Sequence, residues 1–379
     1  MSVPLPLPAR AARPMRIVLA ISTLGAGGAE RVITLLANSL AERGHEITLV
    51  TLMPVAQDFF RSDARVVRIA LGWRGPSRGR LDGLYANALR ARAIRRIVRR
   101  ARAEVVIAFM TDMNVVCIVA CLGLPVAVFA SERIDPRAHD VGRVWNWLRR
   151  LTYRRAAGLV VQTEAVAAWF QAAYPARVTV IPNPVVATVA TAAAAPPATA
   201  TPYLFAAGRL NRQKGFDVLI RAMAILAADG LLLELVIAGE GPEQGALLAL
   251  ATQLGLTSRV RLLGRVPELS SWMAGALGFV LASRYEGFPN VLVEALAHGT
   301  PVIATDCPSG PREILENGKY GLLVPCEDPA ALAQAVLTLA ADVQLQARLR
   351  ELGPRAVDRF RLPAVVARWE SLLQAAVTP

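Results

Sequence analysis

Lysine is nearly absent from this chain. Lys and Arg together number 42 of the 379 residues, and only two of them are Lys, which leaves 40 Arg. Arg presents a flat fork that suits paired hydrogen bonds, whereas Lys presents a compact ammonium, so a chain this biased toward Arg should keep Lys where a point charge is needed. Lys214 fits that expectation, whereas Lys319 lies in the predicted turn Asn317-Gly-Lys-Tyr-Gly321.

Other absences exclude several common types of site. No Asp-x-Asp pair occurs, so the sequence lacks the two carboxylates that commonly bind a metal ion together with a diphosphate. Neither a metal nor another cofactor is therefore expected. The four cysteines show neither zinc-ligand spacing nor a dense disulfide pattern, which favours the reducing cytoplasm. No helix-turn-helix, zinc-finger or RNA-recognition pattern is found, so no nucleic-acid partner is expected.

Segments typical of membrane insertion or export are also missing. The longest apolar stretch, residues 115–130, contains Gly123 and Pro125. This pattern predicts a helix followed by a buried strand rather than a membrane-spanning helix. Residues 1–14 are rich in Pro, Ala and Arg but have no apolar core, which predicts a disordered lead rather than a signal peptide.

The positive charge is concentrated in the first half of the chain. Of the net +13, residues 1–184 contribute 26 Arg against 12 acidic residues, whereas the remainder has 16 basic and 17 acidic residues. Much of this charge lies on one face of a predicted helix, at Arg95, Arg96, Arg99 and Arg100. Two alternatives fit this face: an ordinary solvated surface, or a surface for anionic lipid headgroups at about 1 kcal/mol per basic residue.

Short apolar runs alternate with helical patterns in both halves of the sequence. This alternation predicts two doubly wound, mostly parallel α/β sheets in Rossmann-like domains, residues 15–183 and 203–361, with ligands bound at the carboxyl ends of the strands. The uncharged Ala-, Thr- and Pro-rich segment between them, residues 184–202, is typical of a linker. The expected strands are residues 16–21, 46–52, 66–70, 105–108, 126–129, 159–161 and 178–181, then 203–207, 233–238, 260–263, 279–282 and 302–305.

Glu286 and Glu294 stand eight positions apart around the start of a predicted helix. A strand precedes them, and Pro289 fits the first position of the helix, where its missing N–H costs nothing. The free N–H groups at such a helix start suit an anion such as phosphate. Two carboxylates flanking a phosphate site match a ligand that carries both hydroxyls and phosphates, such as a nucleotide sugar.

This E-x7-E spacing resembles that of the retaining glycosyltransferases of the GT4 type. The resemblance extends over roughly residues 15–375, since further segments match the family's motifs in the same order. They are residues 22–31, 208–217, 238–243, 264–267, 307–313 and 321–325. The resemblance implies the GT-B fold, in which two Rossmann-like domains face a cleft, and a final helix, residues 362–379, that packs back on the first domain.

The resemblance also implies the residues that bind the donor. Glu294 would bind the ribose hydroxyls, and Glu286 would lie beside the donor sugar. Arg209 and Lys214 would replace a metal in offsetting the charge that builds on the leaving diphosphate, which makes Glu286, Arg209 and Lys214 the expected catalytic set. The other expected donor-binding residues are Gly27, Gly28, Glu240, Arg265, Val266, Gly287, Phe288, Asn290 and Val291.

Asp112, Glu132 and Arg133 follow two strands of the first domain and are expected to face the acceptor. Many GT4 relatives carry a histidine in this region, but none of the three histidines of this chain falls there. The run Ser131-Glu132-Arg133 resembles the subgroup that extends lipid-linked oligosaccharides. A structural salt bridge is the alternative interpretation of Glu132 and Arg133.

Together these patterns predict a retaining glycosyltransferase on the cytoplasmic face of a membrane. It would move a hexose or N-acetylhexosamine from a nucleotide-diphosphate sugar to a lipid-linked or polysaccharide acceptor. One alternative is a nucleotide-sugar epimerase with the GT-B fold, although no acid/base pair is placed for proton abstraction. The other is a catalytically silent membrane-surface module, against which the intact Glu286/Glu294 and Arg209/Lys214 sets argue.

Overall fold

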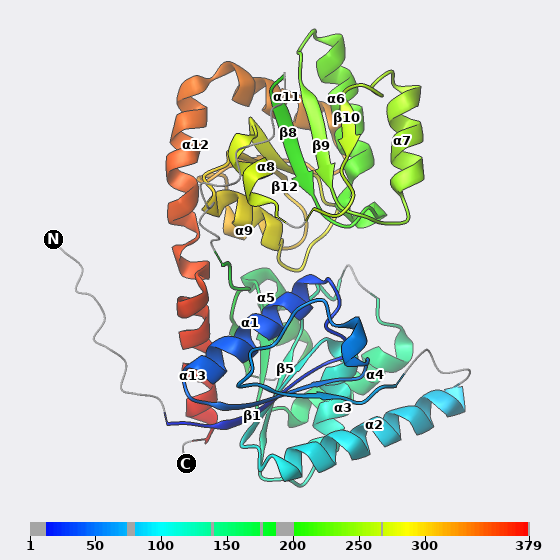
Figure 1. Cartoon of the computed structure of the whole chain (residues 1–379), viewed down its shortest axis with the longest axis vertical. Helices are drawn as coiled ribbons and strands as arrows, with labels where there is room; N and C mark the ends of the chain where they lie inside the picture. Colours follow the sequence, from blue (N-terminus) through cyan, green and yellow to red (C-terminus); the bar gives the residue numbers. More distant parts are fainter. Residues whose placement is uncertain are drawn as a thin grey trace, which may run out of the picture.

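The computed structural model describes residues 13–73, 80–137, 140–174, 177–186, 201–266 and 268–377. Most of the predicted lead and of the predicted linker, and Pro267 of the motif at 264–267, lie outside these residues. The described chain forms two α/β domains, one above the other in Figure 1. The predicted fold class, two doubly wound parallel sheets, is confirmed.

The first domain is built on a seven-stranded sheet in the order β3-β2-β1-β4-β5-β6-β7. Every pairing between neighbouring strands is parallel. The strands are β1 (Arg16–Ile21), β2 (Glu46–Thr51), β3 (Val67–Ala70), β4 (Val105–Phe109), β5 (Ala127–Ser131), β6 (Gly158–Val161) and β7 (Val178–Val180). The helices are α1 (Gly28–Glu42), α2 (Arg80–Arg100), α3 (Thr111–Cys121), α4 (Arg143–Thr152) and α5 (Glu164–Ala173).

The second domain repeats this plan with six strands in the order β10-β9-β8-β11-β12-β13. The strands are β8 (Tyr203–Ala207), β9 (Glu234–Ala238), β10 (Val260–Leu262), β11 (Gly278–Leu281), β12 (Val302–Thr305) and β13 (Leu322–Val324). The helices are α6 (Phe216–Ala228), α7 (Gln244–Gln253), α8 (Ser270–Gly275), α9 (Asn290–Ala297), α10 (Pro311–Ile314), α11 (Pro329–Ala341) and α12 (Val343–Ala356). In each sheet the strand order reverses beside the first strand, and ligands bind parallel sheets at such switch points.

The apolar runs become strands because helices cover both faces of each sheet. Successive side chains of a strand point to opposite faces, so β1 serves two cores. Ile17 and Leu19 pack in the core under α1, whereas Val18 and Ala20 pack in the core under α2 and α3. A strand buried on both sides therefore reads as a continuous apolar run rather than as an alternating one.

The last helix, α13 (Leu362–Val377), returns from the second domain to the first. Figure 1 shows α12 beside the upper domain and α13 continuing downward beside the lower one. Trp369 is 1% exposed and stacks near Phe109 of β4, with 6.5 Å between ring centroids. Glu370 pairs with Arg43 and, at 3.1 Å, with His45 of the first domain. Where the chain crosses back, Val185 forms a parallel bridge with Arg361.

Some local details differ from the sequence-based expectations. The short strand β13 was not predicted, because two of its three residues are only partly buried and give little pattern. Pro289 caps α9 rather than occupying its first position, since its ψ of 86° is not helical. Among the residues described, no helix is both long and apolar enough to span a membrane.

The packing of α13 gives a test of how far the first domain depends on the end of the chain. Trp369→Ala should cost about 3–5 kcal/mol because it empties a large buried site. Scanning calorimetry should show a melting temperature of the first domain lower by roughly 10 °C. The matched control is Trp147→Ala, at a tryptophan that is 60% exposed. Equal melting temperatures for the two variants would contradict the inferred role of α13.

Candidate functional site

Loops that follow the strands of the two sheets face each other across the domain boundary. Asn183 Nδ2, from the first domain, donates to Asn290 Oδ1 at the start of α9, at 2.9 Å. Gly287 lies so close to the first domain that a Cβ atom there would be 2.5 Å from the Arg133 carbonyl oxygen. The E-x7-E segment therefore lines the seam between the domains, and glycine is required at its closest point.

Lys214 and Glu286 form a charge pair at this seam. Lys214 Nζ lies 2.6 Å from Glu286 Oε1, which also accepts a hydrogen bond from Ser283 Oγ at 2.6 Å. The Glu286 side chain is buried, and the Lys214 side chain is 17% exposed. Gly215 allows this placement: it has φ of +62°, and any side chain there would collide with the Ala282 carbonyl at the end of β11. The structure thus brings together two of the three predicted catalytic residues.

Glu294 lies on α9 and forms an ion pair with Arg31 of α1, in the other domain. Burial raises the pKa of Glu294, and the Arg31 guanidinium opposes that rise. Arg31 was not among the residues predicted to form the site. The sequence did contain a signal for this pair. A basic residue in the first turn of a helix is repelled by the positive end of the helix dipole, so it is favoured there only with an acidic partner nearby.

Arg209, the third predicted catalytic residue, is exposed on the loop after β8. Its charge reaches Glu30 of α1: burial raises the pKa of Glu30, and Arg209 lowers it. The Glu30 carboxylate folds over Gly27, where a side chain would collide with it. A Cβ atom at Gly28 would lie 3.0 Å from Asn290 Nδ2. The glycine-rich loop therefore approaches the second domain.

The remaining predicted donor residues are spread over the second domain. The side chain of Glu240 is exposed, and the Arg265 guanidinium lies 4.7 Å from the ring of Phe59 in the first domain. Phe288 is buried against Phe360, with 5.4 Å between ring centroids. Val266 and Val291 pack partly against the same core. Phe288, Val266 and Val291 thus contribute to packing, whereas Glu240 and Arg265 have exposed side chains.

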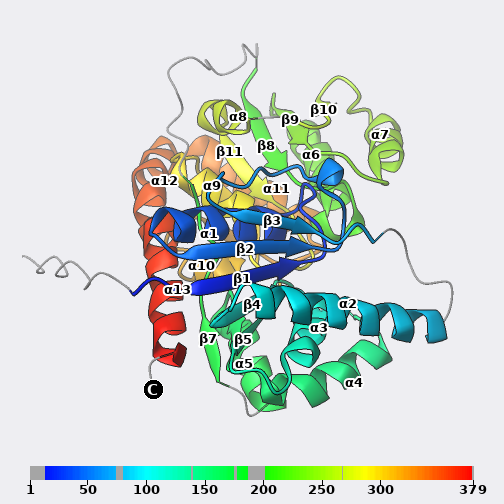
Figure 2. The same cartoon turned by 60° about the horizontal axis from the view of Figure 1, so that its bottom comes forward.

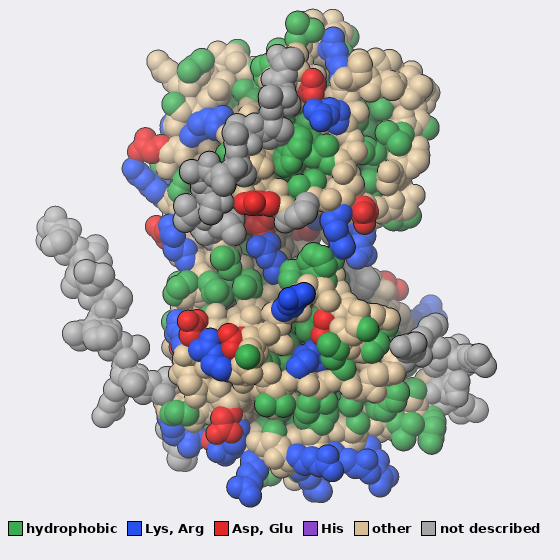
Figure 3. Space-filling view, in the orientation of Figure 1, with side chains coloured by type: hydrophobic (Ala, Val, Ile, Leu, Met, Phe, Trp, Pro, Cys, Tyr) green, Lys and Arg blue, Asp and Glu red, His purple; other side chains and the backbone are tan. Residues whose placement is uncertain are grey.

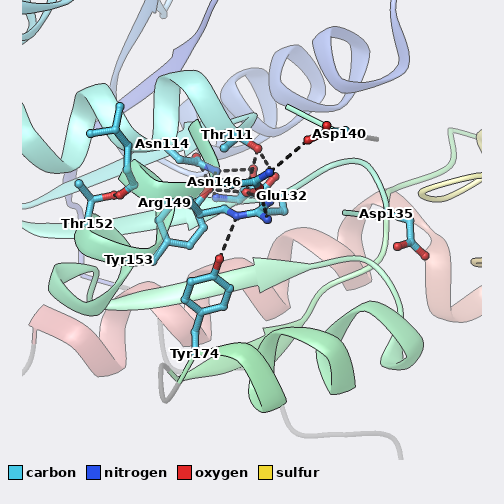
Figure 4. A network of polar contacts seen from close by, with 12 residues as sticks. Thr111, Asn114, Glu132, Asp135, Asp140, Asn146, Arg149, Thr152, Tyr153 and Tyr174 are labelled. Atoms are coloured by element: carbon cyan, nitrogen blue, oxygen red, sulfur yellow. Dashed lines mark hydrogen bonds and ion pairs between the residues drawn. The ribbon is translucent and has the colours of Figure 1, made fainter. Parts of the chain in front are cut away.

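Glu132 and Arg133, predicted together for the acceptor, point in different directions because they are successive residues after a strand. Glu132 is 4% exposed and accepts hydrogen bonds from Thr111 and Tyr153 (Figure 4). Its nearest cation is Arg149, with 3.9 Å between Nη1 and Oε1. Burial raises the pKa of Glu132, and its hydrogen bond with Tyr153 opposes that rise.

Arg133 turns toward the opposite core. Its guanidinium lies 3.8 Å from the ring centroid of Phe109, and Nη1 donates to Asn183 Oδ1 at 2.7 Å. Burial lowers its pKa to about 9. No ion pair joins it to Glu132, so the alternative interpretation of the two residues as one structural salt bridge is wrong. Asp112, the third predicted acceptor residue, accepts a hydrogen bond from Ser22 Oγ at 2.7 Å beside the glycine-rich loop.

Comparison with known proteins assigns this chain to a family. Residues 27–184 match the family model described as glycosyl transferase 4-like domain, and residues 201–342 match that of glycosyl transferases group 1. A lipopolysaccharide core biosynthesis glycosyltransferase of Rhizobium meliloti is 30% identical over 364 residues, covering 92% of this chain and 96% of the relative. The chain is a GT4-type glycosyltransferase.

Other proteins similar to this glycosyltransferase match it over nearly its whole length. A Campylobacter jejuni N-acetylgalactosaminyltransferase, named for an undecaprenol-diphosphate-linked substrate, is 28% identical and covers 95% of this chain and 98% of the relative. A solved glycosyltransferase from Rickettsia africae has a TM-score of 0.80 at 15% identity, covering 97% of this chain and 99% of the other. The Anabaena protein HepE, solved with UDP, has a TM-score of 0.76 at 20% identity and covers 95% and 100%. The predicted GT-B fold is confirmed, and the family favours a transferase over the epimerase and the silent module.

The ribose role expected for Glu294 can be tested by nucleotide binding. A carboxylate that accepts ribose hydroxyls contributes about 1.5–3 kcal/mol, so Glu294→Ala should weaken UDP binding by about 10- to 100-fold in titration calorimetry. Glu351→Ala is the control, because that carboxylate is 67% exposed on α12. Unchanged UDP affinity in Glu294→Ala would rule out the ribose contact.

Proposed function

We propose that this glycosyltransferase is a retaining, metal-independent enzyme that moves a hexose or N-acetylhexosamine from a nucleotide-diphosphate sugar to a lipid-linked or polysaccharide acceptor. The observation that carries this proposal is the Lys214–Glu286 pair at the domain seam. The names of the Campylobacter and Rhizobium relatives support an acceptor on a lipid carrier or lipopolysaccharide. The UDP bound to the Anabaena structure supports a uridine nucleotide as the first donor to try.

In the proposed reaction, the bond between C1 of the donor sugar and the diphosphate oxygen breaks. The acceptor hydroxyl oxygen bonds to C1 from the same face, which retains the configuration. The departing phosphate oxygen takes the proton of that hydroxyl, so the step needs no side-chain base. Negative charge grows on the diphosphate, and preformed positive charge at that place lowers the barrier.

Lys214 and Arg209 are the cations that would meet this charge. The Lys214 ammonium has three N–H donors and uses one for Glu286, so it retains donors for phosphate oxygens. Glu286 then has two roles: it orients Lys214, and it offers a buried acceptor to hydroxyls of the donor sugar. The Arg209 charge also acts on Glu30 of the first domain, whose pKa it lowers. An incoming diphosphate would replace that carboxylate as the partner of Arg209.

The two lysines of the chain supply a matched pair of variants. Lys214→Met should lower the turnover number by about 10²- to 10³-fold, because it removes one preformed charge from the transition state. Lys319→Met should leave turnover unchanged, because Lys319 is exposed and its contacts within the described part of the chain are with Glu316 and Tyr320 on the surface. The assay measures nucleotide released from a panel of UDP-, GDP- and ADP-sugars in the presence of a bacterial lipid extract. If no nucleotide sugar is bound or cleaved, the proposed function fails.

We also propose that the enzyme sits peripherally on the inner face of the cell membrane, through the layer formed by α2, α3 and α4. These helices lie together in Figure 2, and α3 packs against both others. The space-filling view shows basic side chains along the lower edge of the molecule, where α2 runs (Figure 3). Exposed apolar side chains accompany them: Tyr85, Leu89, Val119, Leu122, Val144, Trp147 and Leu151. Apolar groups bordered by arginines suit the interface of an anionic membrane.

The four arginines predicted for lipid contact divide into two groups. Arg95 donates through Nη1 to the carbonyl oxygens of Ala120 and Leu122, both at 2.8 Å. It thereby provides hydrogen-bond donors for carbonyl groups at the C-terminal end of α3, which have no partner within the helix. Arg96, Arg99 and Arg100 are exposed. These three are therefore the side chains available to lipid headgroups.

Vesicle flotation tests this surface. Replacing Arg96, Arg99 and Arg100 with Gln should weaken partition onto vesicles that contain phosphatidylglycerol by about 3 kcal/mol, or roughly 100-fold. The control replaces three exposed arginines elsewhere, Arg221, Arg348 and Arg368, with Gln. It removes the same charge, so equal flotation of the two triple variants would favour the ordinary solvated surface.

A further inference from the structure

A cavity of about 250 Å³ lies in the first domain between α3, α4 and the loop after β5. Its walls include Asp112, Glu132, Val141, Trp145 and Arg149. Gly287, next to Glu286 of the donor site, contacts the carbonyl of Arg133, the residue after Glu132. The cavity therefore adjoins the cleft on the acceptor side. None of Trp145, Val141 and Arg149 was predicted from the sequence to contact the acceptor.

The polar part of the cavity is a buried charge pair that lacks a direct hydrogen bond. Arg149 and Glu132 side chains are each 5% exposed, yet 3.9 Å separates Arg149 Nη1 from Glu132 Oε1. That distance exceeds the range of a hydrogen bond. Figure 4 shows Arg149 between Glu132 and Tyr174. Its Nε donates to Tyr174 Oη at 3.1 Å and its Nη2 to Asn146 Oδ1 at 2.8 Å, so the guanidinium is fixed while Nη1 faces Glu132.

A hydroxyl group suits this pair, because it can donate to the carboxylate and accept from the guanidinium at once. A phosphate does not, because Glu132 and Asp112 would repel it. The apolar wall at Trp145 and Val141 suits the carbon face of a sugar ring. The volume is below the range of about 300–1,000 Å³ that is usual for larger ligands, which fits a single ring.

We propose that this cavity binds one sugar ring of the acceptor, with the Glu132–Arg149 pair holding a ring hydroxyl and Trp145 covering a ring face. The proposal rests on the proposed transferase function and assigns the acceptor's sugar to a definite site. Helix α4 joins it to the membrane surface: Trp145 and Arg149 line the cavity, whereas Val144, Trp147 and Leu151 are exposed on its outer side. A lipid-anchored acceptor held at that outer side would have its sugars near the cavity.

Saturation-transfer NMR with methyl glycosides of glucose, galactose, N-acetylglucosamine and N-acetylgalactosamine tests the proposal. At least one glycoside should receive saturation from the wild-type protein, and Val141→Trp should abolish the signal by filling the cavity. Val343→Trp is the matched control, because Val343 is 73% exposed on α12. Trp145→Leu should weaken binding by about tenfold, whereas Trp145→Phe should retain it, since an aromatic contact contributes about 1 kcal/mol or slightly more.

UDP titration of the same samples separates this proposal from the transferase function. If UDP binds but no glycoside does, or if the glycoside signal persists in Val141→Trp, the cavity proposal is overturned while the proposed function stands. If the wild-type protein binds no nucleotide from the panel of nucleotide sugars, the proposed function itself fails. UDP affinity equal to wild type in Val141→Trp and Trp145→Leu is the expected result, and it shows that both variants are folded.

Discussion

The close approach of the two backbones at Gly287 is the constraint on which the cleft depends. A side chain at this position would collide with the Arg133 carbonyl. The loop that carries Glu286 can therefore contact the first domain only if residue 287 is glycine. That contact sets the donor residues of one sheet against the loops of the other. The cross-domain pairs Arg31–Glu294 and Asn183–Asn290 form around it.

Buried or half-buried charge is arranged differently on the two sides of the cleft. In the second domain, Lys214 and Glu286 are in direct contact, which fixes the position of the ammonium. In the first domain, Glu132 and Arg149 are buried but held apart by their other partners. Burying unpaired charge is costly. A pair held slightly too far apart for a hydrogen bond keeps part of the mutual attraction and leaves room for a neutral polar ligand.

The architecture could be predicted from the sequence more accurately than the positions and contacts of individual side chains. Alternating apolar runs and turns predict both parallel sheets, because a strand covered on two faces must be apolar throughout. The pairing of Lys214 with Glu286 agrees with the scarcity of lysine and with the E-x7-E spacing. Arg133 was grouped with Glu132, yet period-two alternation after β5 directs it to Phe109 instead. Arg149 and Trp145 could not be found from motifs, because only the docking of α4 on α3 brings them to Glu132.

The bridge between Val185 and Arg361 has a consequence for motion. The chain leaves the first domain near Val185 and returns near Arg361, and these two strands are tied by hydrogen bonds: Val185 N donates to Phe360 O at 2.7 Å and Leu362 N to Val185 O at 3.2 Å. Two crossings bound side by side act as one strap. Any movement of one domain relative to the other must therefore bend both crossings together at this point.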